Sequence, residues 1–227
     1  MIEVKNISKL YGRFHALDQV DLHIAANDFL AVLGHNGAGK TTMLKILATL
    51  LKHTSGEVLI DGHNIRKDSH AILRKMGMVS HQAYLYGDLT AKENLAFYAR
   101  CYDVPYAPRR ISELLEKVGL AHRAEESVRR FSRGMQQRLS IARALLNDPK
   151  ILLLDEPYAG LDQKASDFLD KVLLEYHRGG NCILIVSHDI EHIAGLAQRA
   201  VIFDKGKLAW DGSLTGVPVA QFIESVK

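Results

Sequence analysis

Two short segments of the sequence carry residue types and spacings that suit phosphate chemistry. Residues 34–42 read GHNGAGKTT, which fits the phosphate-binding pattern G-x-x-x-x-G-K-[ST] with Gly34, Gly39, Lys40 and Thr41 in register. Glycines in such a loop let backbone N–H groups approach phosphates, and the helix that follows directs its positive end at them. The pattern therefore predicts that Lys40 reaches the β- and γ-phosphates of a nucleotide and that Thr41 binds Mg²⁺.

The second segment ends an apolar run with two adjacent carboxylates. Residues 151–157 read ILLLDEP, so Asp155 and Glu156 close a predicted buried strand. Two neighbouring carboxylates are costly to ionise together unless a cation lies close to them. Beside Mg²⁺ and ATP, Asp155 would hold the metal through water and Glu156 would polarise the attacking water. A solvent-exposed acidic turn is the alternative, but the two segments together favour a nucleotide hydrolase.

The elements around these segments alternate between strand and helix. Apolar runs at residues 29–33 and 151–154 predict strands buried on both faces, and the spacing over residues 41–51 predicts the helix that a phosphate loop requires. Further strands are expected at residues 2–4, 17–24, 56–60, 76–80, 182–187, 200–204 and 206–210, and further helices at residues 163–177, 190–197 and 217–226. This alternation favours an α/β architecture with a mostly parallel sheet covered on both faces.

The stretch from about residue 90 to residue 147 has a different, helical character. Thr90 and Glu93 have the spacing of a capping box at the start of a helix. Helices are predicted over residues 91–102, 108–118 and 133–146. We therefore expect a single domain in which residues 84–147 form an inserted helical subdomain, and residues 1–83 and 148–227 form the nucleotide-binding core.

Length and composition are those of one compact domain. The chain has 227 residues, 47% of them hydrophobic, and a net charge of +3 without a Lys/Arg stripe, which argues against nucleic-acid binding. Its two cysteines lack metal-site or redox spacing, and they predict buried or half-buried free thiols in a reducing compartment. The N-terminus has no signal-peptide core, and no apolar run approaches the roughly 20 residues that span a bilayer. Any membrane role is therefore expected to come through a partner.

The order of the motifs resembles that of the ATP-binding subunits of ABC transporters, over essentially the whole chain. That family carries a phosphate loop, a glutamine after a strand, a signature near LSGGQ, the strand ending in D-E, a D-loop and a histidine. Here the later positions are Gln82, FSRGMQQR at residues 131–138, Asp162 within YAGLD, and His188 within SHD. The resemblance implies a P-loop NTPase fold with a RecA-like, mostly parallel sheet, an antiparallel β subdomain and the inserted α-helical subdomain.

The resemblance also implies how ATP and Mg²⁺ are bound. Two copies would form a head-to-tail homodimer, in which each ATP lies between the phosphate loop of one chain and Ser132, Arg133 and Gly134 of the other. From the residues alone, Ser132 is only a helix N-cap. Asp162 would help to shape the active site of the dimer. The remaining loop residues would complete the phosphate cradle: His35, Asn36, Gly37, Ala38 and Thr42.

Three further side chains receive roles from the same resemblance. Tyr11 would stack on the adenine ring, although an ordinary surface tyrosine is the alternative. Gln82 would contact Mg²⁺ and sense the membrane partner. His188 would hydrogen-bond the γ-phosphate and help to orient Glu156.

The chain departs from the family pattern in the signature and in the D-loop. The signature has Phe131 for leucine, Arg133 for the first glycine and Met135 for glutamine. The D-loop has Tyr-Ala-Gly at residues 158–160 in place of the usual Thr-Ser-Ala. Arg133 would either help to hold a γ-phosphate or be solvated. Because Glu156 and His188 are present, we expect both composite sites of the dimer to hydrolyse ATP.

The segments YGDLTAKENLAFYAR and FSRGMQQRLSIARALLNDP resemble those of the haem-exporter ATPases of cytochrome c maturation. Exporters of drugs, lipids and polysaccharides share them. The implied function is ATP hydrolysis that drives integral membrane permease subunits from the cytoplasmic face of the membrane. The alternative is a soluble ABC ATPase without a transporter, but repair proteins of that kind insert a long coiled coil and ribosomal ones carry two cassettes.

One apolar and aromatic loop follows the predicted Mg²⁺-sensing glutamine. Residues 82–88 read QAYLYGD, and exposed aromatic side chains often mark interfaces. We expect this surface to receive a helix of the membrane subunit. The alternative is that Tyr84, Leu85 and Tyr86 pack the inserted helices onto the core.

Overall fold

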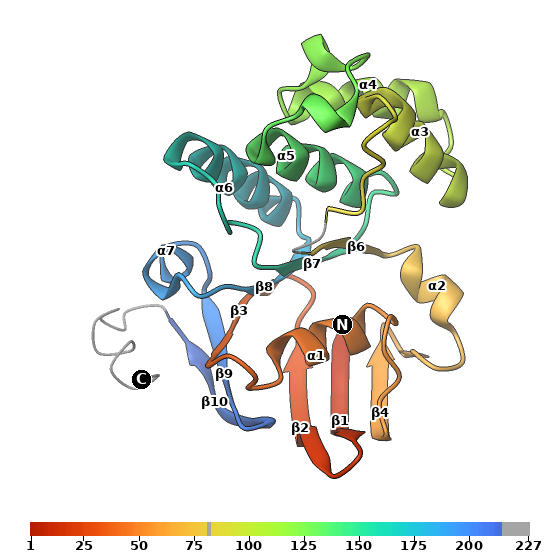
Figure 1. The fold of residues 1–227 in the computed structure, drawn as a ribbon. Helices are drawn as coiled ribbons and strands as arrows, with labels where there is room; N and C mark the ends of the chain where they lie inside the picture. Colours follow the sequence, from red (N-terminus) through yellow and green to blue (C-terminus); the bar gives the residue numbers. More distant parts are fainter. Residues whose placement is uncertain (81–82, 215–227) are drawn as a thin grey trace.

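The computed structural model describes residues 1–80 and 83–214, which form two β-sheets with helices between and beside them (Figure 1). The predicted terminal helix at residues 217–226 and the predicted site residue Gln82 lie outside the described residues. Within the described ranges, no helix has the length and hydropathy that crossing a bilayer requires.

The larger sheet is mostly parallel, as its apolar strands predict. Its order is β10-β9-β3-β8-β7-β6, and neighbours run parallel except for β10, which is antiparallel to β9. Its strands are β3 (Phe29–Gly34), β6 (Met76–Val79), β7 (Ile151–Asp155), β8 (Cys182–Val186), β9 (Arg199–Asp204) and β10 (Lys207–Ser213). Along β3, Phe29, Ala31 and Leu33 face one core, whereas Leu30 and Val32 face the other. Because both faces are covered, such a strand reads as a continuous apolar run.

The smaller sheet is antiparallel throughout and has the order β2-β1-β4-β5. Its strands are β1 (Ile2–Tyr11), β2 (Phe14–Ile24), β4 (Ser55–Ile60) and β5 (His63–Asn64). Strands β1 and β2 are longer than predicted, because register shifts in β1 interrupt the alternation of apolar and polar residues. Asn6 lies at one of these register shifts and has a φ of +51°. Its N–H donates to Asp21 Oδ1 at 2.8 Å.

Helix α1 (Lys40–Leu47) lies between the two sheets, where its apolar side contributes to the core that they share (Figure 1). The helix ends four residues earlier than the prediction of 41–51. Thr49 adopts a positive φ of 60°, and the N–H groups of Leu50 and Leu51 turn back to the carbonyl of Lys45 at 2.9 and 3.1 Å. The residues beyond Ala48 therefore keep helical spacing in sequence without α-helical hydrogen bonding.

The other helices lie on the opposite side of the large sheet, apart from the short helix α2 at its β6 edge (Figure 1). They are α2 (Ser69–Leu73), α3 (Ala91–Cys101), α4 (Ala107–Lys117), α5 (Arg133–Ala144), α6 (Gln163–Arg178) and α7 (Ile190–Ala194), with 3₁₀ turns at Ala121–Arg123 and Val128–Arg130. Helix α3 begins with the predicted capping box, since Thr90 Oγ1 accepts from the Glu93 N–H at 3.1 Å and Glu93 Oε2 accepts from the Thr90 N–H at 2.8 Å. Helix α2 and strand β5 are too short to leave a periodic signal in the sequence.

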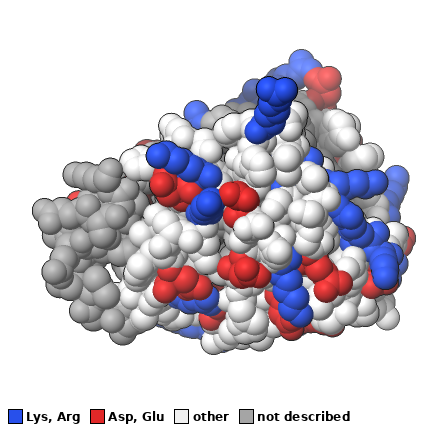
Figure 2. Space-filling model, turned by 90° about the horizontal axis from the view of Figure 1, so that it is seen from below, with Lys and Arg blue, Asp and Glu red and all other residues white. Residues whose placement is uncertain are grey.

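Both cysteines are free thiols, but their exposure differs. Cys182 is buried in β8, as predicted. Cys101 is exposed, contrary to the prediction, because the end of α3 borders a groove rather than the core. On the face seen in Figure 2, Lys and Arg side chains are mixed with Asp and Glu side chains.

Candidate nucleotide-binding site

The loop between β3 and α1 has a backbone shape that only glycines allow at its key points. Gly34, Gly37 and Gly39 have φ values of +135°, +80° and +110°. A Cβ atom at Gly34 would lie 2.2 Å from the carbonyl oxygen of Phe203, and one at Gly39 would lie 2.6 Å from that of Ala16. The loop therefore wraps tightly against the neighbouring backbone and leads directly into the N-terminus of α1, the arrangement that binds phosphates in other proteins.

Lys40 is a buried cation at the start of α1. Its side chain is held over the loop, where Nζ donates to the carbonyl oxygens of Gly34 at 2.6 Å and His35 at 2.9 Å. The residue is only 5% exposed, and burial lowers the pKa of its ammonium group. A buried ammonium is costly unless a negative charge lies near it. This environment fits a nucleotide phosphate, which would supply the countercharge.

Thr41 and Asp155 meet although they are 114 residues apart in the sequence, since Thr41 Oγ1 donates to Asp155 Oδ1 at 3.1 Å. Asp155 is the last residue of β7 and is 7% exposed. Hydroxyl and carboxylate oxygens are ligands that Mg²⁺ accepts, directly or through water. These two residues fit a magnesium ion at the edge of the phosphate loop.

Glu156 and His188 face each other at the ends of neighbouring strands. The His188 N–H donates to Glu156 Oε2 at 3.3 Å, and His188 Nε2 lies 3.0 Å from Glu156 Oε1 without the angle of a hydrogen bond. Burial raises the pKa of Glu156, and the neighbouring His188 partly opposes this rise. A carboxylate whose pKa is raised toward neutrality is better suited to take a proton from water.

These groups share one cavity of about 280 Å³. It is lined chiefly by Tyr11, Phe14, residues 36–42, Glu156 and His188. Segments from the antiparallel sheet, the phosphate loop and two strand ends of the large sheet therefore converge on one space. Gly34, His35 and Asp155 do not line it, but each accepts a hydrogen bond from Lys40 or Thr41, which do.

Two aromatic residues stand at the mouth of the cavity. Tyr11 is 52% exposed, and Lys9 Nζ lies 4.9 Å from the centre of its ring. Phe14 is 62% exposed and pairs with Tyr11 across the tip of the β1–β2 hairpin. The sequence interpretation missed Phe14. The signal was the segment YGRF, in which a short turn between two aromatic residues places both on one hairpin tip.

The predicted signature and D-loop residues do not line this cavity. Ser132 Oγ accepts from the Met135 N–H at 3.3 Å and so caps α5. Asp162 Oδ1 accepts from the Ala165 N–H at 2.8 Å and so caps α6. In the single chain, both residues satisfy the ends of their own helices.

Arg133 lies against the D-loop. A Cβ atom at Gly160 would be 2.8 Å from the guanidinium carbon of Arg133, so the glycine leaves the room that the arginine occupies. Arg133 also lines a second hollow of about 400 Å³, together with Gln136, Gln137 and Glu156. The two departures from the family pattern are thus in contact with each other.

Comparison with known proteins decides the family. The family profile described as ABC transporter matches residues 17–159. The chain belongs to the ABC transporter family. Among similar proteins, the glutamine transport ATP-binding protein GlnQ of Escherichia coli is 38% identical over 94% of this cassette and 91% of its own length. The linearmycin resistance ATP-binding protein LnrL of Bacillus subtilis is 32% identical over 95% of the cassette and 70% of its own length.

Solved structures of similar fold support the same assignment. The dimeric, post-hydrolysis structure of the ATP-binding cassette MJ0796 bound to ADP and Pi superposes with a TM-score of 0.87 at 32% identity, covering 96% of this cassette and 100% of that chain. The ATP-binding subunit of another ABC transporter gives a TM-score of 0.90 at 28% identity, with both chains covered completely. The predicted P-loop NTPase fold is confirmed, and the ABC cassette is an ATPase whose cofactors are ATP and Mg²⁺.

Proposed function

We propose that this ABC cassette is the ATP-hydrolysing subunit of a transporter and drives integral membrane permease subunits from the cytoplasmic face of the membrane. The observation that carries the proposal is the single cavity in which the buried lysine, the paired Glu156 and His188, and the aromatic hairpin tip meet. Each of these groups suits a different part of Mg²⁺-ATP. The residue roles below extend this proposal.

Each group in the cavity has a separate role in phosphoryl transfer. Lys40 binds the β- and γ-phosphates, and the backbone of residues 34–39 together with Thr42 surrounds them. Thr41 and Asp155 hold Mg²⁺, which supplies Lewis-acid polarisation of the phosphates when it is bound. Glu156 accepts a proton from the attacking water, and His188 holds Glu156 in place and contacts the γ-phosphate. Tyr11 stacks on adenine beside Phe14, and Gln82 contributes to the magnesium site.

The second half of each site comes from another copy of the chain. Ser132, Arg133 and Gly134 do not line their own cavity, which is consistent with a head-to-tail homodimer in which they cover the nucleotide of the partner. The first turn of α5 contains no acidic residue, so its N-terminus favours an anion. Asp162 shapes the dimer interface through the D-loop. The solved MJ0796 cassette is itself described as dimeric.

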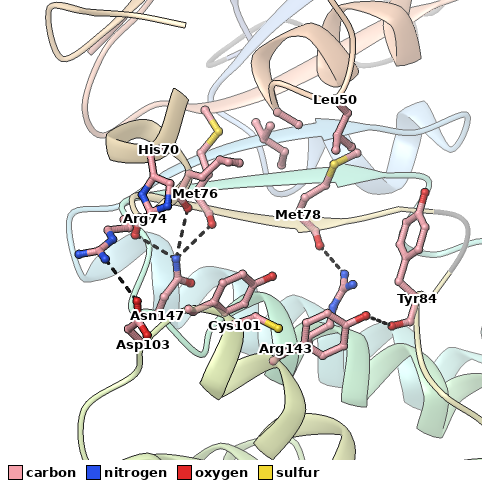
Figure 3. Close-up of a pocket in the computed structure, with 15 residues that line it drawn as sticks. Leu50, His70, Arg74, Met76, Met78, Tyr84, Cys101, Asp103, Arg143 and Asn147 are labelled. Atoms are coloured by element: carbon pink, nitrogen blue, oxygen red, sulfur yellow. Dashed lines mark hydrogen bonds and ion pairs between the residues drawn. The ribbon is translucent and has the colours of Figure 1, made fainter. Parts of the chain in front are cut away.

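We assign residues 84–147 to a helical subdomain that transmits motion between the membrane partner and the core, formed by residues 1–83 and 148–227. The boundary between the two parts contains a groove of about 500 Å³. Leu50 and Met78 lie on one side of this groove and Cys101 and Arg143 on the other (Figure 3). The groove is predominantly apolar and open to solvent, so it suits a short amphipathic helix of a permease subunit.

Aromatic side chains lie in and beside this groove, since Tyr84 lines it and Tyr86 contacts Tyr98, which also lines it. Tyr84 and Tyr86 are 52% and 49% exposed, whereas Leu85 packs against the core. Leu85 therefore fits the alternative in which the loop packs the helices onto the core, and the half-exposed ring of Tyr86 also contacts Phe97 and Tyr98 of α3. Arg143, anchored by a 2.8 Å bond from Nη2 to the Met78 carbonyl oxygen, lies 5.7 Å from the ring centre of Tyr84. Exposed aromatic rings next to a fixed arginine are typical of protein interfaces.

Introducing charge at Tyr84 and Tyr86 should separate the cassette from its membrane partner. We expect the double variant Tyr84→Asp, Tyr86→Asp to lower recovery of the permease subunits by about tenfold or more, since two aromatic anchors are replaced by solvated carboxylates. Co-purification from detergent-solubilised membranes measures this effect. Tyr106→Asp is the matched control, because Tyr106 is 86% exposed on the same subdomain and does not line the groove. Full recovery of the double variant would rule out this docking surface.

We further propose that the transporter serves haem export in cytochrome c biogenesis. The support is the resemblance of the segments at residues 86–100 and 131–149 to haem-exporter ATPases. The alternatives are an exporter of drugs, lipids or polysaccharides and, as a different class, a soluble ABC ATPase. The groups that select a substrate would lie on the membrane subunit, so the partner decides among these functions.

Capture of that partner tests the proposed function. Tagged Glu156→Gln protein, incubated with ATP, is used to pull down proteins from detergent-solubilised membranes of the native organism, with identification by mass spectrometry. Recovery of cytochrome c maturation membrane proteins supports haem export. Recovery of another integral membrane protein instead assigns the cassette to another exporter, and soluble partners alone would refute the transport function.

A further inference from the structure

We propose that Tyr158, Asp170 and His192 are positioning residues that hold Glu156 and His188 in the relative position that hydrolysis requires. This inference rests on the proposed function of that pair. Tyr158 lies two residues after Glu156 in the loop that leaves β7, and His192 lies four residues after His188 on α7. Asp170 lies within α6 and joins them. The three residues thus form a second connection between the same two strand-end loops that carry Glu156 and His188.

The connection is made by two short hydrogen bonds to one carboxylate oxygen. The Tyr158 hydroxyl donates to Asp170 Oδ1 at 2.7 Å, and His192 Nε2 lies 2.9 Å from the same oxygen. The rings of Tyr158 and His192 are also in contact, with 4.5 Å between their centres. Hydrogen bonds to an ionised carboxylate are stronger than those between neutral groups, so the contact is both packed and directional.

Burial makes this cluster more than a surface ion pair. The side chains of His192 and Asp170 are 22% and 21% exposed. Burial and the adjacent Asp170 carboxylate raise the pKa of Tyr158, so its hydroxyl remains a donor throughout the working pH range. Weak solvent screening lets such a partly buried network hold a fixed geometry.

Glu156 needs such support because its own backbone is strained. It adopts φ +53°, a left-handed conformation that non-glycine residues rarely take. Conformations of this kind persist only where surrounding contacts enforce them. The Glu156 N–H bonds to the Val186 carbonyl at 2.9 Å, which fixes the strand side, and Tyr158 fixes the outgoing side of the same turn.

The His188 loop depends on the same cluster. His188 lies two residues before α7, which spans only Ile190–Ala194, and so short a helix has little stability of its own. Asp189 Oδ1 accepts from the His192 N–H at 3.0 Å and caps this helix. His192 therefore joins the cap beside His188 to Asp170, so a shift of His192 would move His188 relative to Glu156.

A purely structural role would affect stability without a selective effect on catalysis, and a pair of matched tyrosines separates the two. Tyr158→Phe removes only the hydroxyl that reaches Asp170. Tyr176→Phe removes a buried hydroxyl on α6, which donates to the Pro149 carbonyl oxygen at 2.9 Å. Tyr176 does not line the nucleotide cavity. Steady-state ATPase rates and thermal melting are measured for both variants.

We expect Tyr158→Phe to lower kcat by about three- to tenfold while KM for ATP changes less than about twofold, because the loss is in alignment and not in nucleotide binding. Tyr176→Phe should keep the wild-type kcat, although its melting temperature shifts by about as much as that of Tyr158→Phe. His192→Leu should reproduce the kcat loss, and His192→Gln, which keeps a donor for Asp170, should recover much of it.

Three results would overturn the inference: a wild-type kcat in Tyr158→Phe, an equal loss in Tyr176→Phe, or indistinguishable rates for His192→Leu and His192→Gln. If Tyr158→Phe does not fold, the two His192 variants decide alone. Failure of the proposed function looks different, since wild-type protein would then lack ATPase activity or Lys40→Ala would retain it.

Discussion

Replacing Lys40 by alanine is expected to abolish ATP turnover. Lys40 is 5% exposed and its ammonium group lies over the phosphate loop, so its loss removes the proposed contact to the β- and γ-phosphates. Charge-assisted contacts to developing negative charge in a partly buried site typically contribute about 10²–10³-fold to rate. Phosphate release by the purified variant, compared with wild type at saturating ATP, measures the effect.

Lys45→Ala provides the control for Lys40→Ala. Lys45 belongs to the same helix, but its side chain is exposed and does not line the nucleotide cavity. It should hydrolyse ATP at the wild-type rate. Turnover by Lys40→Ala at a rate near that of Lys45→Ala would contradict the proposed phosphate contact.

Replacing Glu156 by glutamine should separate ATP binding from hydrolysis. The amide has nearly the shape of the carboxylate but does not accept a proton from water, so we expect hydrolysis to slow by about 10²-fold or more. Loss of one negative charge near the phosphates should leave ATP binding intact and let an ATP-bound dimer accumulate. Single-turnover phosphate release and size-exclusion chromatography with and without ATP measure the two effects.

Glu175→Gln makes the same chemical change on the exposed side of α6, where Glu175 pairs with Lys117 at 2.8 Å. Its rate should equal that of wild type, and ATP should not trap its dimer. Wild-type hydrolysis by Glu156→Gln would refute the assignment of Glu156 as the base, and a variant that remains monomeric with ATP would refute the trapped dimer.

The sequence predicts best the elements whose pattern is local. The glycines of residues 34–39 and the apolar runs of β3 and β7 follow from backbone sterics and from burial on both faces, which act over a few residues. The N-cap of α3 is equally local, since Thr90 and Glu93 are three residues apart. These features appear in the structure where the sequence places them.

The errors lie where distant contacts outweigh local pattern. The predicted helix over residues 41–51 stops at Leu47, because the chain turns back to meet the antiparallel sheet. Strands β1 and β2 extend over polar positions, because pairing with each other and with β4 satisfies their backbone groups. Phe14 enters the site only because the hairpin tip brings it opposite Tyr11.

The sequence by itself determined the chemical groups of the site and the family, because motif order and spacing survive without knowledge of contacts. Only the tertiary structure decided which groups meet. Thr41 reaches Asp155 across 114 residues, Arg133 rests on Gly160, and Asp170 joins Tyr158 to His192. For Thr41 and Asp155, the reason is that the parallel strands of one sheet end at the same edge, whatever the length of chain between them.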